Sequence, residues 1–236
     1  MTLRPKAQWT VALAGFLLAL LPAAAGALPP IPAPLVDVRG YVPGVMVDMR
    51  YAGPANFTGR PVPGYEAGVC LLTRQAAEAL ARAQASLASR GLGLKVLDCY
   101  RPVRAVQSFM AWARDPGDQL MAARHYPRVP KSELFARGYI AEKSGHSRGS
   151  TVDVTLIALP DGSERDMGGI YDLFDPTAEA LSPDVSRDAR DSRMLLRSAM
   201  EEAGFVPYEP EWWHFTLKGE PFPDLYFDVP VREAPR

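Results

Sequence analysis

The sequence predicts an α+β fold: a single mature domain with a central antiparallel or mixed sheet and flanking helices. Strand-like and helix-like segments are mixed along the chain without the regular βαβ alternation of parallel-sheet proteins. The sequence contains neither an internal repeat nor a second linker. Its 236 residues, of which 47% are hydrophobic and 22% charged, are enough to bury one well-packed core.

Residues 1–27 have the pattern of a secretory signal peptide. A basic start precedes an apolar run that ends at Leu21, and small residues follow. Residues 25–27 (Ala-Gly-Ala) fit a cleavage site, and residues 23–25 are a second candidate. The alternative is a membrane anchor, but the apolar run is short for a span of about 20 residues. We therefore expect export to the periplasm, the cell surface or the medium, without stable membrane insertion after cleavage.

The mature chain is expected to begin with extended segments. Residues 28–44 are a proline-rich lead with a first strand, and residues 45–236 form the domain that carries the chemistry. Short alternating runs within residues 36–53 favour strands, whereas the Gly/Pro-rich residues 56–68 favour a loop. The 23 prolines of the chain agree with many turns and extended connections.

Helices and strands follow in an irregular order. Thr73 can cap a helix, because apolar residues recur after it at the helical period. Residues 94–100 predict a strand with a buried centre. Residues 101–115 predict a helix with proline near its start, and residues 192–205 predict another that a glycine closes.

Two cysteines, Cys70 and Cys99, would meet an oxidising compartment after export. An even count in that setting favours a disulfide, which would close a loop of about 30 residues and contribute roughly 3.6 kcal/mol in the loop-entropy model. The alternative is two separate buried thiols. Their spacing resembles no zinc module, so a cysteine-based metal site is not expected.

The first candidate site segment is "SGHSRGSTVDVTL", residues 144–156. Its second half alternates apolar and polar residues as a strand does, which places Asp153 on the polar face. His146 precedes it in a Ser/Gly-rich loop that can fold back beside Asp153. This spacing alone is weak evidence, since a surface histidine near a strand aspartate would give the same pattern.

The second candidate segment is "EPEWWHF", residues 209–215, in which Glu211 and His214 flank two tryptophans. Prolines argue against a long helix, and the aromatic run favours a strand. In a strand, residues 211 and 214 face opposite sides, so both reach one pocket only if Glu211 lies at a bend just before the strand. The alternative is a buried histidine among aromatics with a solvated glutamate. Together with His146 and Asp153, however, His214 completes a two-histidine, one-carboxylate set that suits catalytic zinc, with Glu211 as general base.

The chain resembles the D-alanyl-D-alanine dipeptidases of the VanX type, which are zinc enzymes with the D-Ala-D-Ala metallopeptidase (Hedgehog/DD-peptidase-like) fold. The resemblance covers most of residues 45–232 and is carried by "YAGPANFTGRPVPGY", "DCYRPVRAV", "SGHSRGSTVDVTL", "MGGIYDLFD" and "EWWHF". It implies one zinc ion per chain, held by His146, Asp153 and His214. It also implies Glu211 as the catalytic base and Arg101 as the group that stabilises the tetrahedral intermediate.

The resemblance further implies the substrate-binding residues. Asp172 would contact the free ammonium group of the dipeptide, while Ser144 and Tyr51 would line the pocket; a solvated loop acid is the alternative for Asp172. The signal peptide and the cysteines depart from the cytoplasmic members of the family. His125 lies outside the matching motifs, and we expect it at the surface or in a loop, away from the site.

Three functions of different classes follow. The first is hydrolysis of free D-Ala-D-Ala, the second a D,D-carboxypeptidase or related peptidase acting on longer cell-wall peptides, and the third a zinc-binding module without catalysis. The presence of both Glu211 and Arg101 argues against the third, and Asp172 favours the first over the second. The formal net charge of −1 gives no sign of a nucleic-acid partner.

Overall fold

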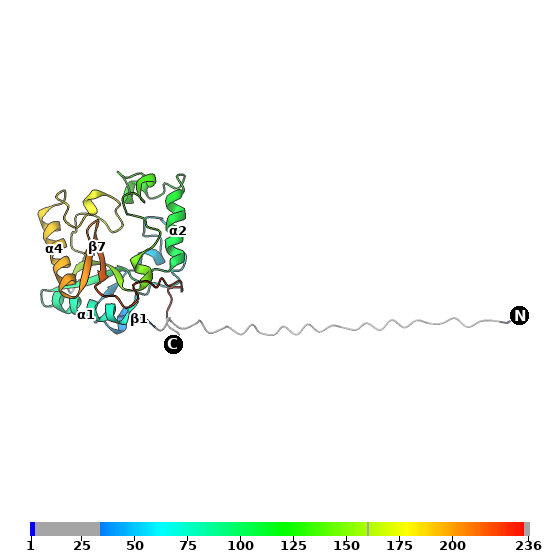
Figure 1. Cartoon of the computed structure of the whole chain (residues 1–236), viewed down its shortest axis with the longest axis horizontal. Helices are drawn as coiled ribbons and strands as arrows, with labels where there is room; N and C mark the ends of the chain where they lie inside the picture. Colours follow the sequence, from blue (N-terminus) through cyan, green and yellow to red (C-terminus); the bar gives the residue numbers. More distant parts are fainter. Residues whose placement is uncertain (3–33, 160, 234–236) are drawn as a thin grey trace.

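The core of the fold is a five-stranded mixed sheet in the order β2-β4-β5-β7-β6 (Figure 1). A computed structural model describes residues 1–2, 34–159 and 161–233. The predicted signal peptide and the proline-rich part of the lead therefore lie outside the described residues, apart from residues 1–2. The strands are β2 (Met46–Val47), β4 (Leu92–Asp98), β5 (Thr151–Ala158), β6 (Phe205–Tyr208) and β7 (Glu211–Leu217).

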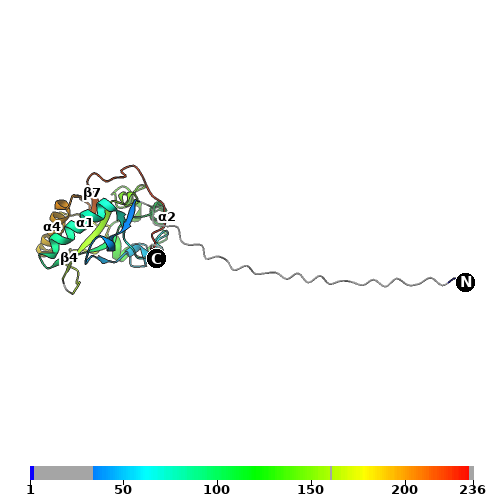
Figure 2. The same cartoon turned by 90° about the horizontal axis from the view of Figure 1, so that it is seen from below.

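A second, two-stranded antiparallel sheet and four helices complete the regular structure of the described chain. The small sheet pairs β1 (Leu35–Asp37) with β3 (Leu71–Thr73). The helices are α1 (Arg74–Ala88), α2 (Val103–Arg114), α3 (Ala122–His125) and α4 (Arg187–Glu202). Helices α1 and α4 contact each other and the sheet, whereas α2 lies at the other end of the molecule (Figures 1 and 2). This arrangement confirms the α+β prediction with a central mixed sheet.

Local sequence signals account for the helices. The Thr73 side chain accepts a hydrogen bond from the backbone N–H of Ala76 at 3.3 Å, which caps α1 as predicted. Helix α2 begins directly after Pro102, and α4 is followed by Gly204 with φ of 98°. The buried faces of α1 and α4 contain alanine and leucine and contact the sheet, whereas the buried face of α2 combines alanine with Phe109 and Trp112.

The strand prediction for residues 36–53 is largely wrong. This stretch contains the last two residues of β1, the two-residue strand β2 and two short 3₁₀ helices, Val38–Gly40 and Arg50–Ala52. Pro43 and the left-handed Gly44 (φ of 77°) interrupt the alternation, so a long strand cannot form. Even so, the segment belongs to the core, since Val38 and Tyr51 are fully buried.

The central strand β5 is buried on both faces. Val152, Val154 and Leu156 point to one side as predicted, but Thr151, Asp153 and Thr155 on the other side are equally inaccessible. A polar face without solvent must meet other polar groups. Asp153 does so in the site described below.

The predicted disulfide is present. Cys70 and Cys99 are joined, and both are fully buried. The bond links the start of β3 to the end of β4, next to Arg101. In the part of the chain that the structure describes, no helix is long and apolar enough to cross a membrane.

Candidate active site

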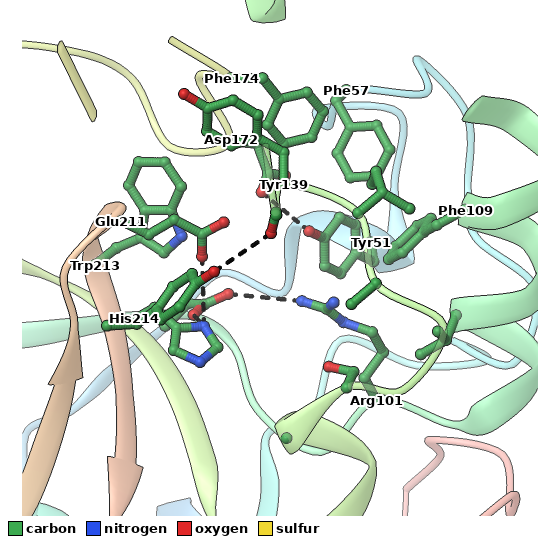
Figure 3. A pocket seen from close by; sticks show the side chains of 18 of the residues that line it. Tyr51, Phe57, Arg101, Phe109, Tyr139, Asp172, Phe174, Glu211, Trp213 and His214 are labelled. Carbon is green, nitrogen blue, oxygen red and sulfur yellow. Dashed lines mark hydrogen bonds and ion pairs between the residues drawn. The ribbon is translucent and has the colours of Figure 1, made fainter. Parts of the chain in front are cut away.

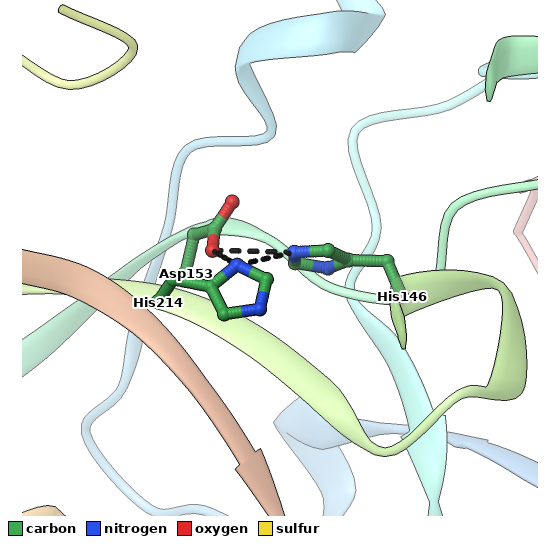
Figure 4. A group of neighbouring side chains, drawn as sticks. All are labelled: His146, Asp153 and His214. Carbon is green, nitrogen blue, oxygen red and sulfur yellow. Dashed lines mark hydrogen bonds and ion pairs between the residues drawn. The ribbon is translucent and has the colours of Figure 1, made fainter. Parts of the chain in front are cut away.

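Two histidines and one aspartate converge at the centre of the sheet, as predicted. His146 Nε2 lies 3.2 Å from Asp153 Oδ1 and 3.3 Å from His214 Nδ1, and His214 Nδ1 lies 3.1 Å from the same Asp153 oxygen. One ligand atom from each residue lies within 4.8 Å of the others, a geometry suited to a metal ion (Figure 4). His146 and Asp153 are buried, and His214 is partly accessible.

The register of the sheet creates this cluster. Asp153 on β5 is paired with His214 on β7 and with Asp98 on β4, so three chemically active side chains lie side by side. A register shift between Val96 and Asp98 brings Asp98, instead of Leu97, opposite Asp153. Such bulges re-aim side chains next to active sites.

His146 reaches the cluster from a 3₁₀ turn, Gly145–Arg148, directly before β5. The Ser144 side chain caps this turn by accepting a hydrogen bond from the His146 N–H at 3.3 Å. Gly149 then reverses the chain in the left-handed region (φ of 77°), where an added Cβ would lie 2.5 Å from the Leu35 side chain. The turn therefore fixes His146 beside the first residues of β5.

The donor set fits a divalent cation. His146 Nδ1 lies 2.7 Å from the Cys99 carbonyl oxygen, which can only accept, so Nδ1 carries the proton and Nε2 offers a lone pair to the cluster. Asp153 Oδ1 is buried and has no hydrogen-bond partner of good geometry, although both imidazoles are close. A buried acceptor facing two ring nitrogens is the arrangement that a zinc ion would satisfy.

The surroundings set the charge of each member. Burial lowers the pKa of His146, which keeps its ring neutral and able to bind a metal. Burial alone would raise the pKa of Asp153, but the two histidines lower it well below its ordinary value. As for His146, burial would lower the pKa of His214, but its contact with Asp153 raises it. The cluster thus contains a stable carboxylate.

Glu211 lies beside the cluster, with Oε2 at 3.5 Å from His214 Nδ1 (Figure 3). Burial raises its pKa to about 7, against the opposing effect of His214. Glu211 and His214 share one pocket because the regular register between β6 and β7 is lost. Pro207 pairs with Phe215, but Tyr208 pairs with Glu211. Residues 212–214 are thus extra on β7, so the irregularity lies within the strand and not before it.

Arg101 lies on the opposite side of the pocket from Glu211. Its Nε donates to Asp98 Oδ2 at 2.9 Å, and its guanidinium group lies over the rings of Tyr51 and Phe109, 5.1 and 5.2 Å from their centroids. A terminal nitrogen lies 3.7 Å from Asp153 Oδ2. The charge is therefore held in one position by a carboxylate and two aromatic faces.

Asp172 forms the far end of the pocket. Its Oδ1 accepts a hydrogen bond from the Tyr51 hydroxyl at 3.0 Å, while Oδ2 is buried without a partner. Burial raises the pKa of Asp172 well above its ordinary value, and the negative charge of Asp153 adds to the effect. Only 4% of the residue is exposed, so the alternative of a solvated loop acid is wrong. A bound cation would remove the unfavourable burial of this carboxylate.

All of these groups except His146 line one cavity of about 260 Å³ (Figure 3). Ser144 and Tyr51 also line it, so the three residues that the sequence suggested for substrate binding lie in one cavity. The remaining wall is mainly aromatic and includes Phe57, Phe109, Tyr139, Phe174, Tyr208 and Trp213. Such a surface excludes water and strengthens the electrostatic interactions inside.

Comparison with known proteins identifies the family of this chain. A family model described as D-ala-D-ala dipeptidase, Peptidase_M15, matches residues 32–232. The chain belongs to this family. The resemblance noted in the sequence is therefore confirmed, and with it the expectation of an enzyme of the M15 peptidase class.

Several relatives match over most of their own length. A D-alanyl-D-alanine dipeptidase of Streptomyces coelicolor is 48% identical over 82% of this chain and 96% of its own. The dipeptidase of Enterococcus faecium is 43% identical over 81% and 95%, and that of Escherichia coli 32% identical over 78% and 84%. A solved structure of the D,D-pentapeptidase VanY in complex with Zn(II) aligns with a TM-score of 0.38 at 16% identity, covering 73% of this chain and 85% of that one.

The structure adds site residues of this M15 peptidase that the sequence did not reveal. Asp98 accepts hydrogen bonds from Arg101 and, at 2.7 Å, from the Tyr65 hydroxyl, and it lies 3.5 Å from His146 Nδ1. The Tyr171 hydroxyl donates to Asp153 Oδ2 at 2.9 Å. Asp98 is the first residue of the matching "DCYRPVRAV" motif, and this position was the signal that could have found it.

The expectation for His125 is wrong. The residue is buried, with 3% exposure, and its Nδ1 lies 3.0 Å from the backbone carbonyl oxygen of Asp172. The sequence did not indicate this contact, because His125 and Asp172 are 47 residues apart. His125 ends the single-turn helix α3, which packs against the loop that carries Asp172.

Proposed function

We propose that the protein is a zinc-dependent dipeptidase that hydrolyses free D-alanyl-D-alanine to two molecules of D-alanine. The observation that carries the proposal is one pocket with Asp153 and His214 of the metal-ligand set at one end and the buried Asp172 carboxylate, whose Oδ2 has no hydrogen-bond partner, at the other. The first end suits hydrolysis of an amide, and the second suits a free ammonium group. The names of the relatives support this substrate.

His146, Asp153 and His214 would hold the zinc ion. When bound, zinc polarises the scissile carbonyl and makes a water molecule acidic enough to attack near neutral pH. The Cys99 carbonyl fixes the tautomer of His146, and the Tyr171 hydroxyl holds the second oxygen of Asp153. Both contacts leave the remaining lone pairs directed at one point.

Glu211 would act as the general base and then as the general acid. It accepts the proton of the attacking water and delivers it to the amine nitrogen of the leaving D-alanine. A carboxyl group with a pKa of about 7 can do both near neutral pH, since it is neither fully charged nor fully protonated there. Its contact with His214 holds it beside the nucleophile.

Arg101 would stabilise the negative charge that develops on the carbonyl oxygen. Its guanidinium group is permanently charged and is already oriented by Asp98 and by the Tyr51 and Phe109 rings. A preoriented charge in a pocket that excludes water needs little reorganisation during the reaction. Asp172 would bind the substrate ammonium, with Tyr51 holding its other oxygen.

We also propose that the protein acts outside the cytoplasm. Residues 1–27 have the signal-peptide pattern, and the buried Cys70–Cys99 disulfide suits an oxidising compartment. N-terminal sequencing of the protein from a periplasmic fraction should find a start near Leu28. Retention of residues 1–27 on a membrane-bound protein would instead support the anchor alternative.

The substrate assignment is tested by comparing free D-Ala-D-Ala with N-acetyl-D-Ala-D-Ala on the mature, zinc-loaded protein. We expect the free dipeptide to be preferred by at least about a hundredfold, because an acylated nitrogen leaves Asp172 buried without a cation. Equal hydrolysis of both would contradict the dipeptidase and favour the D,D-carboxypeptidase. Zinc binding without hydrolysis of either would favour the non-catalytic module.

A further inference from the structure

A buried histidine outside the catalytic cluster contacts the backbone of the residue at the far end of the pocket. His125 is 3% exposed, and its Nδ1 lies 3.0 Å from the Asp172 carbonyl oxygen. A carbonyl oxygen only accepts, so Nδ1 must carry the proton and donate it. The imidazole thus donates a hydrogen bond to the main chain of Asp172.

Asp172 needs such support because its backbone is strained. Its φ of 58° lies in the left-handed region, and among the residues that the structure describes it is the non-glycine residue found there. Asp and Asn adopt this conformation more readily than other non-glycine residues, but it still costs free energy that the surrounding structure must offset. The strain therefore marks a position whose orientation the fold holds against local preference.

The same conformation determines where the carboxylate points. Oδ1 meets the Tyr51 hydroxyl, and Oδ2 is buried in the pocket without a hydrogen-bond partner. Relaxation of the backbone towards an extended or right-handed conformation would turn the side chain away from both. By holding the backbone carbonyl of Asp172, His125 thus also fixes the position of the free carboxylate oxygen, Oδ2.

His125 holds this loop at two points. Besides the side-chain contact, its own carbonyl oxygen accepts a hydrogen bond from the Phe174 N–H at 2.7 Å. A substitution at position 125 leaves that main-chain bond available and removes the contact with Asp172 alone. The loop would stay attached, while the conformation of residue 172 would lose its direct support.

We infer that His125 is a positioning residue that sets the amine specificity of this enzyme by holding Asp172 in the left-handed conformation. The inference rests on the proposed function, because it takes the ammonium group of the dipeptide as the ligand of Asp172. His125 touches neither the substrate nor the metal ligands in this account. Its effect should therefore appear only with substrates that carry a free amine.

The test uses two substrates that differ in the amine alone: D-Ala-D-Ala and propionyl-D-alanine. The quantity compared is the ratio of their kcat/KM values, measured on the mature zinc-loaded protein. His125→Leu should lower this ratio about tenfold, through the free dipeptide, with zinc content and the propionyl substrate unchanged. His125→Asn places an N–H near the position of Nδ1 and should restore the ratio, whereas His125→Gln places it too far along the side chain and should not.

A double-mutant cycle separates positioning from a general effect on the fold. Asp172→Asn tolerates the same backbone conformation but does not attract an ammonium group. In that background, His125→Leu should change the ratio by less than about twofold, because the group that it positions is already lost. Equal losses on both substrates, or an independent effect in the double mutant, would overturn the inference.

Three further outcomes remain distinguishable. If His125→Leu does not fold, the Asn and Gln variants decide: an equal ratio in the two would overturn the inference, and a ratio kept by Asn alone would support it. If the parent protein does not hydrolyse D-Ala-D-Ala, the proposed function fails before any variant is compared. If the parent hydrolyses it and His125→Leu keeps the ratio, only the positioning role fails.

Discussion

The two ends of the pocket are built in different ways. At the metal end, Asp98, Asp153 and His214 lie side by side on three paired strands whose hydrogen bonds fix their spacing, and His146 joins them from the 3₁₀ turn before β5. At the amine end, Asp172 lies on a loop outside regular structure, in a left-handed conformation. Its neighbours Tyr51 and His125 come from short 3₁₀ and α-helical turns.

The difference implies that the metal end is rigid and that the amine end can be adjusted. A metal site tolerates little displacement of its ligands, and a central strand that is buried on both faces gives that precision. Substrate selection depends on one carboxylate that a few contacts orient, so small changes in the loop would alter it without disturbing the metal. A substitution at one end of the pocket should therefore leave the other end intact.

The largest effect is expected at the metal end. His214→Ala removes one of three ligands and leaves Asp153 buried beside a cavity, so zinc content should fall strongly and hydrolysis of D-Ala-D-Ala should be lost. Metal analysis of the purified protein measures the first, and a D-alanine release assay the second. Full zinc occupancy in this variant would show that the cluster is not the zinc site.

Arg101→Ala should damage catalysis and spare the metal. Loss of one oriented group at the oxyanion typically costs about 2.7–4 kcal/mol, a fall in kcat of about 10²–10³-fold. Arg104→Ala is the matched control, because this arginine pairs with Asp228 at the surface and does not line the pocket. Similar losses in both variants would remove the special role of Arg101.

Asp172→Asn should act at the amine end alone. The variant keeps the side-chain volume but loses the charge, so kcat/KM for free D-Ala-D-Ala should fall about ten- to a hundredfold while zinc content stays the same. Steady-state kinetics with the free and N-acetylated dipeptides measure the change. An unaltered preference for the free amine would show that another group recognises it.

The smallest effect concerns the stability of the loop that carries Asp172. Asp175 is paired with Arg128, and this contact lowers the pKa of Asp175 to about 2. A depressed carboxyl pKa stabilises the fold above the unfolded value of about 3.9, and the contribution is lost as the pH falls towards 2. Because Arg128 is mostly exposed, the contribution should be below about 1 kcal/mol.

Denaturant unfolding of the parent and of Asp175→Asn at several pH values measures this contribution. The two proteins should differ most above pH 4 and converge as the pH falls from 4 towards 2. A difference in the free energy of unfolding that stays constant over this range would assign the effect to the hydrogen bonds of Asp175 with Thr177 instead. Zinc content should be the same in both proteins at neutral pH.

Sequence periodicity was sufficient where local signals decide the structure. Thr73 and Pro102 correctly predicted the starts of two helices, and the motif residues His146, Asp153 and His214 do meet. Periodicity failed for residues 36–53, where Pro43 and the left-handed Gly44 interrupt the strand pattern. Local turn geometry, which the alternation of side chains does not encode, decided that segment.

The missed site residues depend on contacts between distant parts of the chain. Asp98 enters the site only because a bulge shifts the register of β4 against β5. His125 reaches Asp172 across 47 residues of sequence, through the packing of two irregular segments. Neither a register shift nor loop packing leaves a pattern in a single sequence, so both contacts required the structure, although Asp98 belongs to a motif that the sequence analysis had matched.

The central claim is that the metal cluster and the proton transfer are separate functions of one pocket. Glu211→Ala tests it most directly, with Glu209→Ala as the matched control, since Glu209 pairs with Arg197 outside the pocket. Zinc content and D-Ala-D-Ala hydrolysis are measured side by side. We predict that Glu211→Ala keeps its zinc and loses about 10²–10⁴-fold or more in kcat, while the control keeps both. Zinc retention with turnover within a few-fold of the parent would contradict the account.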